Sequence, residues 1–261
     1  MKAKTRGFGT VYLSLFFVFL YLPVLSVVLY SFNASRSTAQ WTGWTLDWYR
    51  QLFSDRAIVE AFRVSIVVAL LTALLSAVLG TFAAVISLWV TSRMKTAIQG
   101  MMILPLIVPE VALGVSLLFF FNAMRLPFGV LTLVLSHSLF CVPYVYIMVR
   151  LRLQEIDRSI LESALDLGAS TWQMVRTIIL PLVAPSIVTA ALLCLAMSLD
   201  DVIISTYMSG PRSTTLPVHV FSMMRVGVTP KVNALCTLIL IGTFFIIGLS
   251  QLITNKRRFA K

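Results

Sequence analysis

Six long apolar runs constrain the fold of this chain more than any other feature. A run of about 20 apolar residues is what an α-helix needs to cross the hydrocarbon core of a bilayer. A helix in lipid also satisfies its own backbone hydrogen bonds. The sequence therefore predicts an all-α polytopic membrane protein with one domain over residues 1–261. Its six transmembrane helices are expected at about residues 10–31, 62–90, 97–121, 129–149, 178–199 and 232–253.

The third run is interrupted by Pro105 and Pro109. Proline lacks a backbone N–H, but membrane helices tolerate it where neighbours or hydroxyl groups bond to the freed carbonyls. We therefore expect one membrane span here, with an irregularity at the prolines.

Composition excludes several classes of protein. Hydrophobic residues make up 59% of the chain and charged residues only 12%, about half the share in soluble domains. The three cysteines lie inside apolar runs, and only two histidines occur, so we expect neither a disulfide framework nor a metal site. We expect His137 to form hydrogen bonds in helix packing and to have no transport role. These residues are Cys141, Cys194, Cys236, His137 and His219.

The net charge of +11 comes from basic residues placed between the apolar runs rather than along one stripe. This distribution argues against nucleic-acid binding and is typical of residues that orient a membrane protein. With the N-terminus in the cytoplasm, thirteen of the 21 Lys and Arg residues fall on the cytoplasmic side. We therefore expect both termini in the cytoplasm and an uncleaved first span. Trp41, Trp44 and Trp48 then lie in an outer loop and are expected at the lipid headgroups.

The segment between the fourth and fifth runs, about residues 150–177, predicts a helix, a glycine bend and a second helix. Apolar residues recur with helical spacing after Asp157, which is a favourable N-cap residue. Gly168 is placed to end this helix, and Ser170 to begin the next one. An exposed element of this kind is suited to docking on a partner protein.

This segment carries the loop motif of ABC importer permeases, E-A-A, three residues, G, nine residues and I-x-L-P. The matching positions are Glu162, Ala164, Gly168, Ile178, Leu180 and Pro181, with Ser163 in place of the middle alanine. The stretches SFNASR, SHSLFCVPYV, SLDDVIIS, SGPRSTTLP and GVTPKVNALCT extend the likeness along the chain. The chain thus resembles the permease subunits of spermidine/putrescine importers.

The resemblance implies a type I ABC importer permease in the bacterial inner membrane. It implies that this chain forms a heterodimer with a second permease subunit. Two ATPase subunits and an external polyamine-binding protein would complete the importer. Its coupling helix would dock the ATPase through Glu162, Ala164, Asp166 and Gly168. The chain would be a transport subunit and not an enzyme. It contains no G-x-x-x-x-G-K-[ST] motif, so we expect ATP and Mg²⁺ to bind the partner ATPase and no cofactor to bind here.

Three acids lie in or beside the apolar runs, namely Glu110, Asp200 and Asp201. Carboxylates are costly in a membrane and normally face a polar cavity or a partner. At 1.5 Å per residue, Glu110 is roughly 20 Å and Asp200 roughly 33 Å from the inner ends of their runs. We therefore expect a ladder of acids about 13 Å long that guides the cation inward. Either aspartate is a candidate for the pathway, with Asp200 preferred.

Four aromatic residues are further candidates to contact the cation, although packing explains each of them as well. They are Trp48, Tyr144, Tyr146 and Tyr207. The Ser198 hydroxyl is expected to bond to the substrate or to a carbonyl of its own helix.

Three alternatives remain from the residues alone. An importer of an anion or of a metal-related solute would have the same loop motif, but an anion importer predicts basic residues along its pathway. An intramembrane aspartyl hydrolase would need two facing carboxylates. A cation channel would conduct without ATP.

Overall fold

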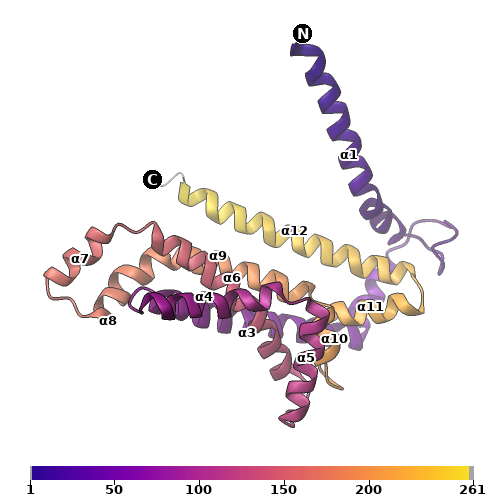
Figure 1. Cartoon of the computed structure of the whole chain (residues 1–261). Coiled ribbons are helices and arrows are strands. Elements are labelled where there is room, and N and C mark those ends of the chain that lie inside the picture. The colour runs from indigo at the N-terminus through magenta and orange to yellow at the C-terminus, as the bar shows by residue number, and fades with distance from the viewer. Residues whose placement is uncertain (1, 259–261) are drawn as a thin grey trace. The chain divides into compact units, whose positions relative to one another are not determined.

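The computed structural model describes the backbone of residues 2–258, and it is almost entirely helical (Figure 1). Among these residues the only β-pairing is an isolated bridge between Asn33 and Trp44. The predicted all-α class is therefore confirmed. The helices form two compact units, Met1–Val59 with Val220–Lys261, and Glu60–His219. The single domain over residues 1–261 stays a prediction.

The second unit contains most of the helices. It begins at Glu60, within α3, and ends at His219, within α11. All elements between these two helices belong to it. The bounds are α3 Arg56–Ile86, α4 Ser92–Ile107, α5 Glu110–Ala123, α6 Val130–Gln154, α7 Arg158–Asp166, α8 Thr171–Met174, the π-helix Val175–Ile179, α9 Leu180–Asp200, α10 Ile203–Met208 and α11 Leu216–Val226.

The core of this unit lies where α6 packs against α9. Val145 and Val149 of α6 and Val183 of α9 are fully buried there. Gly80 of α3 lies so close to α6 that a Cβ atom on it would be 2.6 Å from Cβ of Val145. Because lipid tails are as apolar as these side chains, close packing is what holds the helices together.

The first unit contains α1 (Lys2–Tyr30), α2 (Asp47–Ser54) and α12 (Pro230–Arg258). The last of these packs against both of the others. Nζ of Lys231 lies 2.6 Å from Oδ2 of Asp55, which fixes the start of α12 to the chain just after α2. This hydrogen bond to Lys231 lowers the pKa of Asp55 below its ordinary value.

The loop between α1 and α2 is organised around the buried side chain of Asn33. Its amide nitrogen donates to two loop carbonyls and its amide oxygen accepts from two backbone N–H groups, a full set of local bonds. The partners are Ser37, Gln40, Ser35 and Thr42. The indole N–H of Trp48 donates to the Asn33 carbonyl at 2.7 Å.

Four helices within the described residues are long and apolar enough to cross a membrane. They are Tyr12–Tyr30, Arg56–Ile86, Val130–Gln154 and Thr171–Asp200, and they lie where the first, second, fourth and fifth spans are predicted. The sixth run lies on α12, whose described apolar part is Pro230–Phe244. The count of six transmembrane helices stays a prediction. The structure does not describe the side chains of residues 2–9, 11, 158 and 245–258, nor any part of residues 1 and 259–261. Eight of the thirteen basic residues that predicted the orientation are among them.

The third predicted span is not one continuous helix. It divides into α4 and α5, whose axes differ by 106°. The break lies at Val108, whose backbone is extended, and Pro109, which precedes the first residue of α5. Proline disfavours helical backbone in the residue before it and offers no N–H to continue the helix, so the chain turns here.

Candidate functional site

The three membrane acids line one cavity of about 550 Å³ in the second unit. The cavity lies among the end of α4, the start of α5, α6 and the junction between α9 and α10. Its lining is mostly apolar apart from the acids and Tyr144. The residues are Pro105, Leu106, Val108, Glu110, Leu113, Phe140, Tyr144, Met197, Asp200, Asp201, Val202, Ile203 and Ile204.

The break at Pro109 brings Glu110 to this cavity. Glu110 is the first residue of α5 and its side chain is exposed. The N-terminal end of a helix favours a negative charge, since the unpaired backbone N–H groups point toward it. Glu110 is thus placed at the bend.

The expected ladder, about 13 Å long, is wrong in its geometry. It assumed that the run containing Glu110 rises as one straight helix. Because that run turns by 106°, Glu110 shares one cavity with Asp200 and Asp201. The three acids form a cluster rather than successive steps.

The two neighbouring aspartates have different surroundings. Asp200 ends α9, and its side chain is exposed. Asp201 is only 6% exposed, and its carboxylate accepts the backbone N–H of Ile204 at 3.3 Å and of Ser205 at 2.6 Å. Both aspartates line the cavity, but Asp201 is held as the cap of α10, whereas Asp200 has an exposed side chain without such a cap role.

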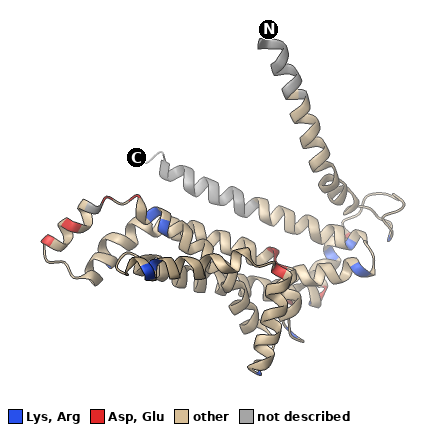
Figure 2. Cartoon of the chain, in the orientation of Figure 1, with Lys and Arg blue, Asp and Glu red and all other residues tan. Residues whose placement is uncertain are grey.

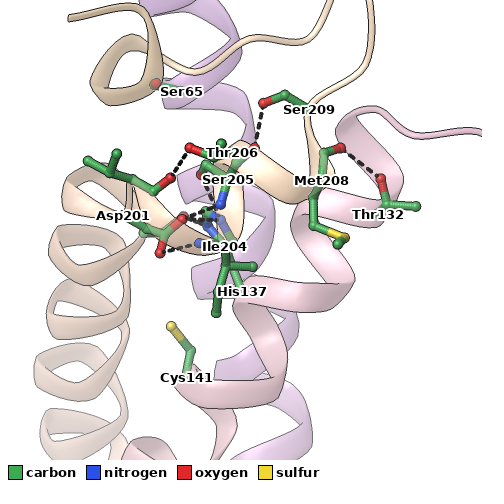
Figure 3. A network of polar contacts seen from close by, with 12 residues as sticks. Ser65, Thr132, His137, Cys141, Asp201, Ile204, Ser205, Thr206, Met208 and Ser209 are labelled. Carbon is green, nitrogen blue, oxygen red and sulfur yellow. Dashed lines mark hydrogen bonds and ion pairs between the residues drawn. The ribbon is translucent and has the colours of Figure 1, made fainter. Parts of the chain in front are cut away.

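A fully buried histidine on α6, His137, contacts Asp201 and the start of α10 (Figure 3). His137 Nε2 lies 3.2 Å from Oδ2 of Asp201 and 3.1 Å from Oγ of Ser205. Its Nδ1 lies 2.7 Å from Oγ of Ser198. A carboxylate only accepts hydrogen bonds, so Nε2 donates to Asp201.

The network confirms that His137 forms hydrogen bonds between packed helices. It corrects the prediction for Ser198, whose buried hydroxyl contacts His137 instead of a carbonyl of its own helix or the cavity. Spacing along the chain did not reveal this pair, because the two residues lie 61 positions apart and meet only through helix packing.

The aromatic candidates are scattered. Tyr144 lines the cavity, whereas Tyr146 is 1% exposed in the core. The ring of Tyr207 packs on Gly114 of α5, where an added Cβ would lie 2.6 Å from Cδ2 of the ring. Trp48 belongs to the first unit, where it bonds to Asn33.

Two of the free cysteines lie on facing helices, a relationship that the sequence did not indicate. The Cys194 Sγ lies 3.5 Å from the Cys141 carbonyl oxygen, and the Cys141 Sγ lies 3.8 Å from that of Cys194. Within the described residues, no group of three His, Cys, Asp or Glu side chains could hold a metal ion.

The loop after α6 has the predicted helix, glycine bend and helix. Asp157 caps α7 by accepting the Ser159 backbone N–H at 3.0 Å, and this bond lowers the pKa of Asp157. At the other end Gly168 has φ of +78°, the left-handed conformation that glycine adopts most readily. Its N–H donates to the Leu165 carbonyl while that of Ala169 donates to Ala164, which is a Schellman motif.

Ser170 caps α8 together with Gln173, and the π-helix then leads into α9. On α7, Glu162 and Asp166 are exposed, whereas Ala164 is buried against the hydrophobic core. Figure 2 shows acidic residues on α7 and again near the end of α9. The exposed face of α7 also includes apolar Leu165.

Residues 76–259 match the family described as binding-protein-dependent transport system inner membrane component. The chain belongs to this family. It is a membrane-embedded permease of a transport system rather than an enzyme. The family match includes the cavity acids and the whole loop after α6.

Curated relatives match most of the permease. It is 42% identical to the putrescine transport system permease protein PotI of Escherichia coli K12, over 91% of this chain and 87% of PotI. It is 38% identical to the spermidine/putrescine permease PotC of Haemophilus influenzae, over 92% and 93% of the two chains.

Solved structures show the fold. The permease superposes on a chain of a bacterial ABC transporter that imports the acidic polysaccharide alginate, with a TM-score of 0.77, 17% identity and 97% coverage of both chains. A chain of the MetNI methionine ABC transporter gives a TM-score of 0.61 at 19% identity, with 80% of this chain and 97% of the other covered. The permease thus has the ABC importer fold that its sequence resembles.

Proposed function

We propose that this permease moves polyamines of the putrescine and spermidine class into the cytoplasm. The observation that carries the proposal is the cavity in which Glu110, Asp200 and Asp201 come together. A polyamine has ammonium groups along an apolar chain, and this cavity combines carboxylates with apolar walls. The names of the relatives with 38–42% identity support the same substrate class.

The fold does not select the substrate, because a neighbour with the same fold imports an acidic polysaccharide. An anion would be repelled by the acids of this cavity. An aspartyl hydrolase is disfavoured by the family and by Asp201, whose carboxylate is engaged by α10 and His137. The family match also disfavours a channel, because the family consists of components of binding-protein-dependent transport systems.

The rest of the importer follows from the same proposal. A second permease subunit pairs with this one, two ATPase subunits bind ATP and Mg²⁺ on the cytoplasmic side, and a periplasmic protein delivers the polyamine. The α7 helix is the coupling helix, with Glu162, Asp166 and the Gly168 bend facing the ATPase. Both termini lie in the cytoplasm, as the placement of basic residues favours.

The test is uptake of radiolabelled putrescine and spermidine by the complete importer in proteoliposomes with ATP inside or outside. We expect uptake that requires ATP on the ATPase side and falls at least about 10-fold in Asp200→Asn. Asp47→Asn is the matched control, because Asp47 is an exposed acid of the other unit. Absence of ATP-dependent uptake by the wild-type importer would refute the proposal.

A further inference from the structure

We infer that His137 is a positioning residue for transport: it fixes the nearly buried carboxylate of Asp201 at the start of α10, so that Asp200 and Glu110 are the exposed carboxylates of the cavity. This inference rests on the proposed function and assigns a role to a residue that the sequence left without one. The four side chains come from three places: Asp200 and Asp201 from the break at the end of α9, Glu110 from the bend before α5, and His137 from α6.

The break at the end of α9 is where the inference begins. Two adjacent residues of a continuous helix point about 100° apart, so in an unbroken α9 the two aspartates would differ only in their direction around one helix. The backbone of Asp201 is instead extended, with φ of −68° and ψ of 123°. Its carboxylate turns back onto the first N–H groups of α10.

A cap on so short a helix needs further support. Helix α10 has six residues and does not form a stable helix by itself. His137 supplies the support, since its ring bonds to α9 through Ser198, to the junction through Asp201 and to α10 through Ser205. One side chain of α6 therefore fixes both helices that flank the break (Figure 3).

The far end of α10 is held independently of the histidine. Thr132 of α6 donates to the Met208 carbonyl at 3.3 Å, and the Met208 side chain is fully buried. Loss of His137 is therefore expected to loosen the aspartate end of α10 first. A buried carboxylate without its partner is costly, so Asp201 would leave its position on α10, become more exposed in the cavity that it already lines, and compete with Asp200 for the cation.

The transport test compares three variants in the complete importer. His137→Leu removes both ring nitrogens, His137→Gln keeps an N–H donor that can reach Asp201, and Ser136→Ala is the matched control. Ser136 is a buried α6 neighbour whose hydroxyl has no hydrogen-bond partner in the described part of the chain. We expect about a 10-fold rise in the polyamine concentration for half-maximal uptake in His137→Leu, partial recovery in His137→Gln and no change in Ser136→Ala.

A double-mutant cycle tests whether His137 acts through Asp201. If it does, His137→Leu changes uptake by less than about twofold when Asp201→Asn is already present, because the two changes remove one interaction. A full effect of His137→Leu in that background would overturn the inference. An unchanged half-saturation concentration in His137→Leu alone would also overturn it.

A thiol-labelling test needs no transported substrate, so its result is separable from the polyamine assignment. In a background with Cys141→Ala, Cys194→Ala and Cys236→Ala, single reporters Asp200→Cys and Met208→Cys are treated with a membrane-impermeant cationic methanethiosulfonate. We expect fast labelling of the first and slow labelling of the second. His137→Leu should reduce the ratio of the two rates by about fivefold or more, as the junction loses its single orientation. An unchanged ratio would overturn the inference, whatever the importer transports.

Discussion

The Tyr207 ring of α10 packs on the backbone of Gly114 in α5, and a Cβ atom on that glycine would lie 2.6 Å from Cδ2 of the ring. The absence of a side chain at Gly114 thus lets the two helices beside the cavity approach each other. Each of them begins next to a cavity acid, Glu110 for α5 and Asp201 for α10. The contact therefore links the positions of these acids.

Gly114→Ala is expected to destabilise the permease by about 1–3 kcal/mol, since the ring of Tyr207 must move to admit the new methyl group. Thermal unfolding of the purified complex would measure the loss. Gly100→Ala is the control, because nothing lies within 4 Å of the Cβ that it adds. Equal unfolding temperatures for the two variants would contradict the proposed close contact.

Asp200→Asn and Asp201→Asn are expected to differ. The first changes an exposed side chain and should leave thermal stability unchanged while uptake falls. The second weakens the bonds to His137 and to the start of α10, and should cost about 2 kcal/mol of stability. Parallel unfolding and uptake measurements test this, and a loss of stability in Asp200→Asn alone would reverse the assignment.

Gly168→Ala is expected to weaken assembly with the ATPase, because a Cβ at φ of +78° strains the bend by about 1 kcal/mol. Gly168→Asn is the control, since asparagine tolerates the left-handed conformation better. Co-purification of the ATPase subunit is the measurement. If both variants retain the ATPase as wild type does, the bend is not needed for docking.

The ion pair between Asp55 and Lys231 predicts a pH dependence of stability. The pKa of Asp55 is lower in the folded protein than its ordinary value of 3.8. The unfolded chain therefore binds the proton more readily, and the stabilisation is complete above pH 3.8 and is lost as the pH falls through the lowered value.

Asp55→Asn should therefore cost up to about 1 kcal/mol at pH 7, because the pair is partly exposed and screened by salt. The difference from wild type should disappear in acid below the lowered pKa. Unfolding of the purified complex from pH 7 to pH 3 is the measurement, with Asp47→Asn as the exposed control. A cost that stays constant with pH would contradict the ion pair as its source.

The loop between α6 and α9 could be predicted almost completely from the sequence. Caps and glycine bends depend on residues within a few positions, so Asp157, Gly168 and Ser170 indicate helix ends wherever the segment lies. The locations of four membrane helices were likewise set by local hydrophobicity. The break at Pro109 was visible as an interruption, but its angle depends on the helices packed around it.

The sequence by itself determined a polytopic helical membrane protein, its loop of two helices around a glycine bend, and which acids lie in apolar runs, because lipid solvation and local backbone chemistry act along the chain. Only the tertiary structure decided that Glu110 shares a cavity with Asp200 and that His137 holds Asp201. Those relationships join residues far apart in the sequence. They depend on the packing of α6 against α9 and on the turn before α5, which no local pattern specifies.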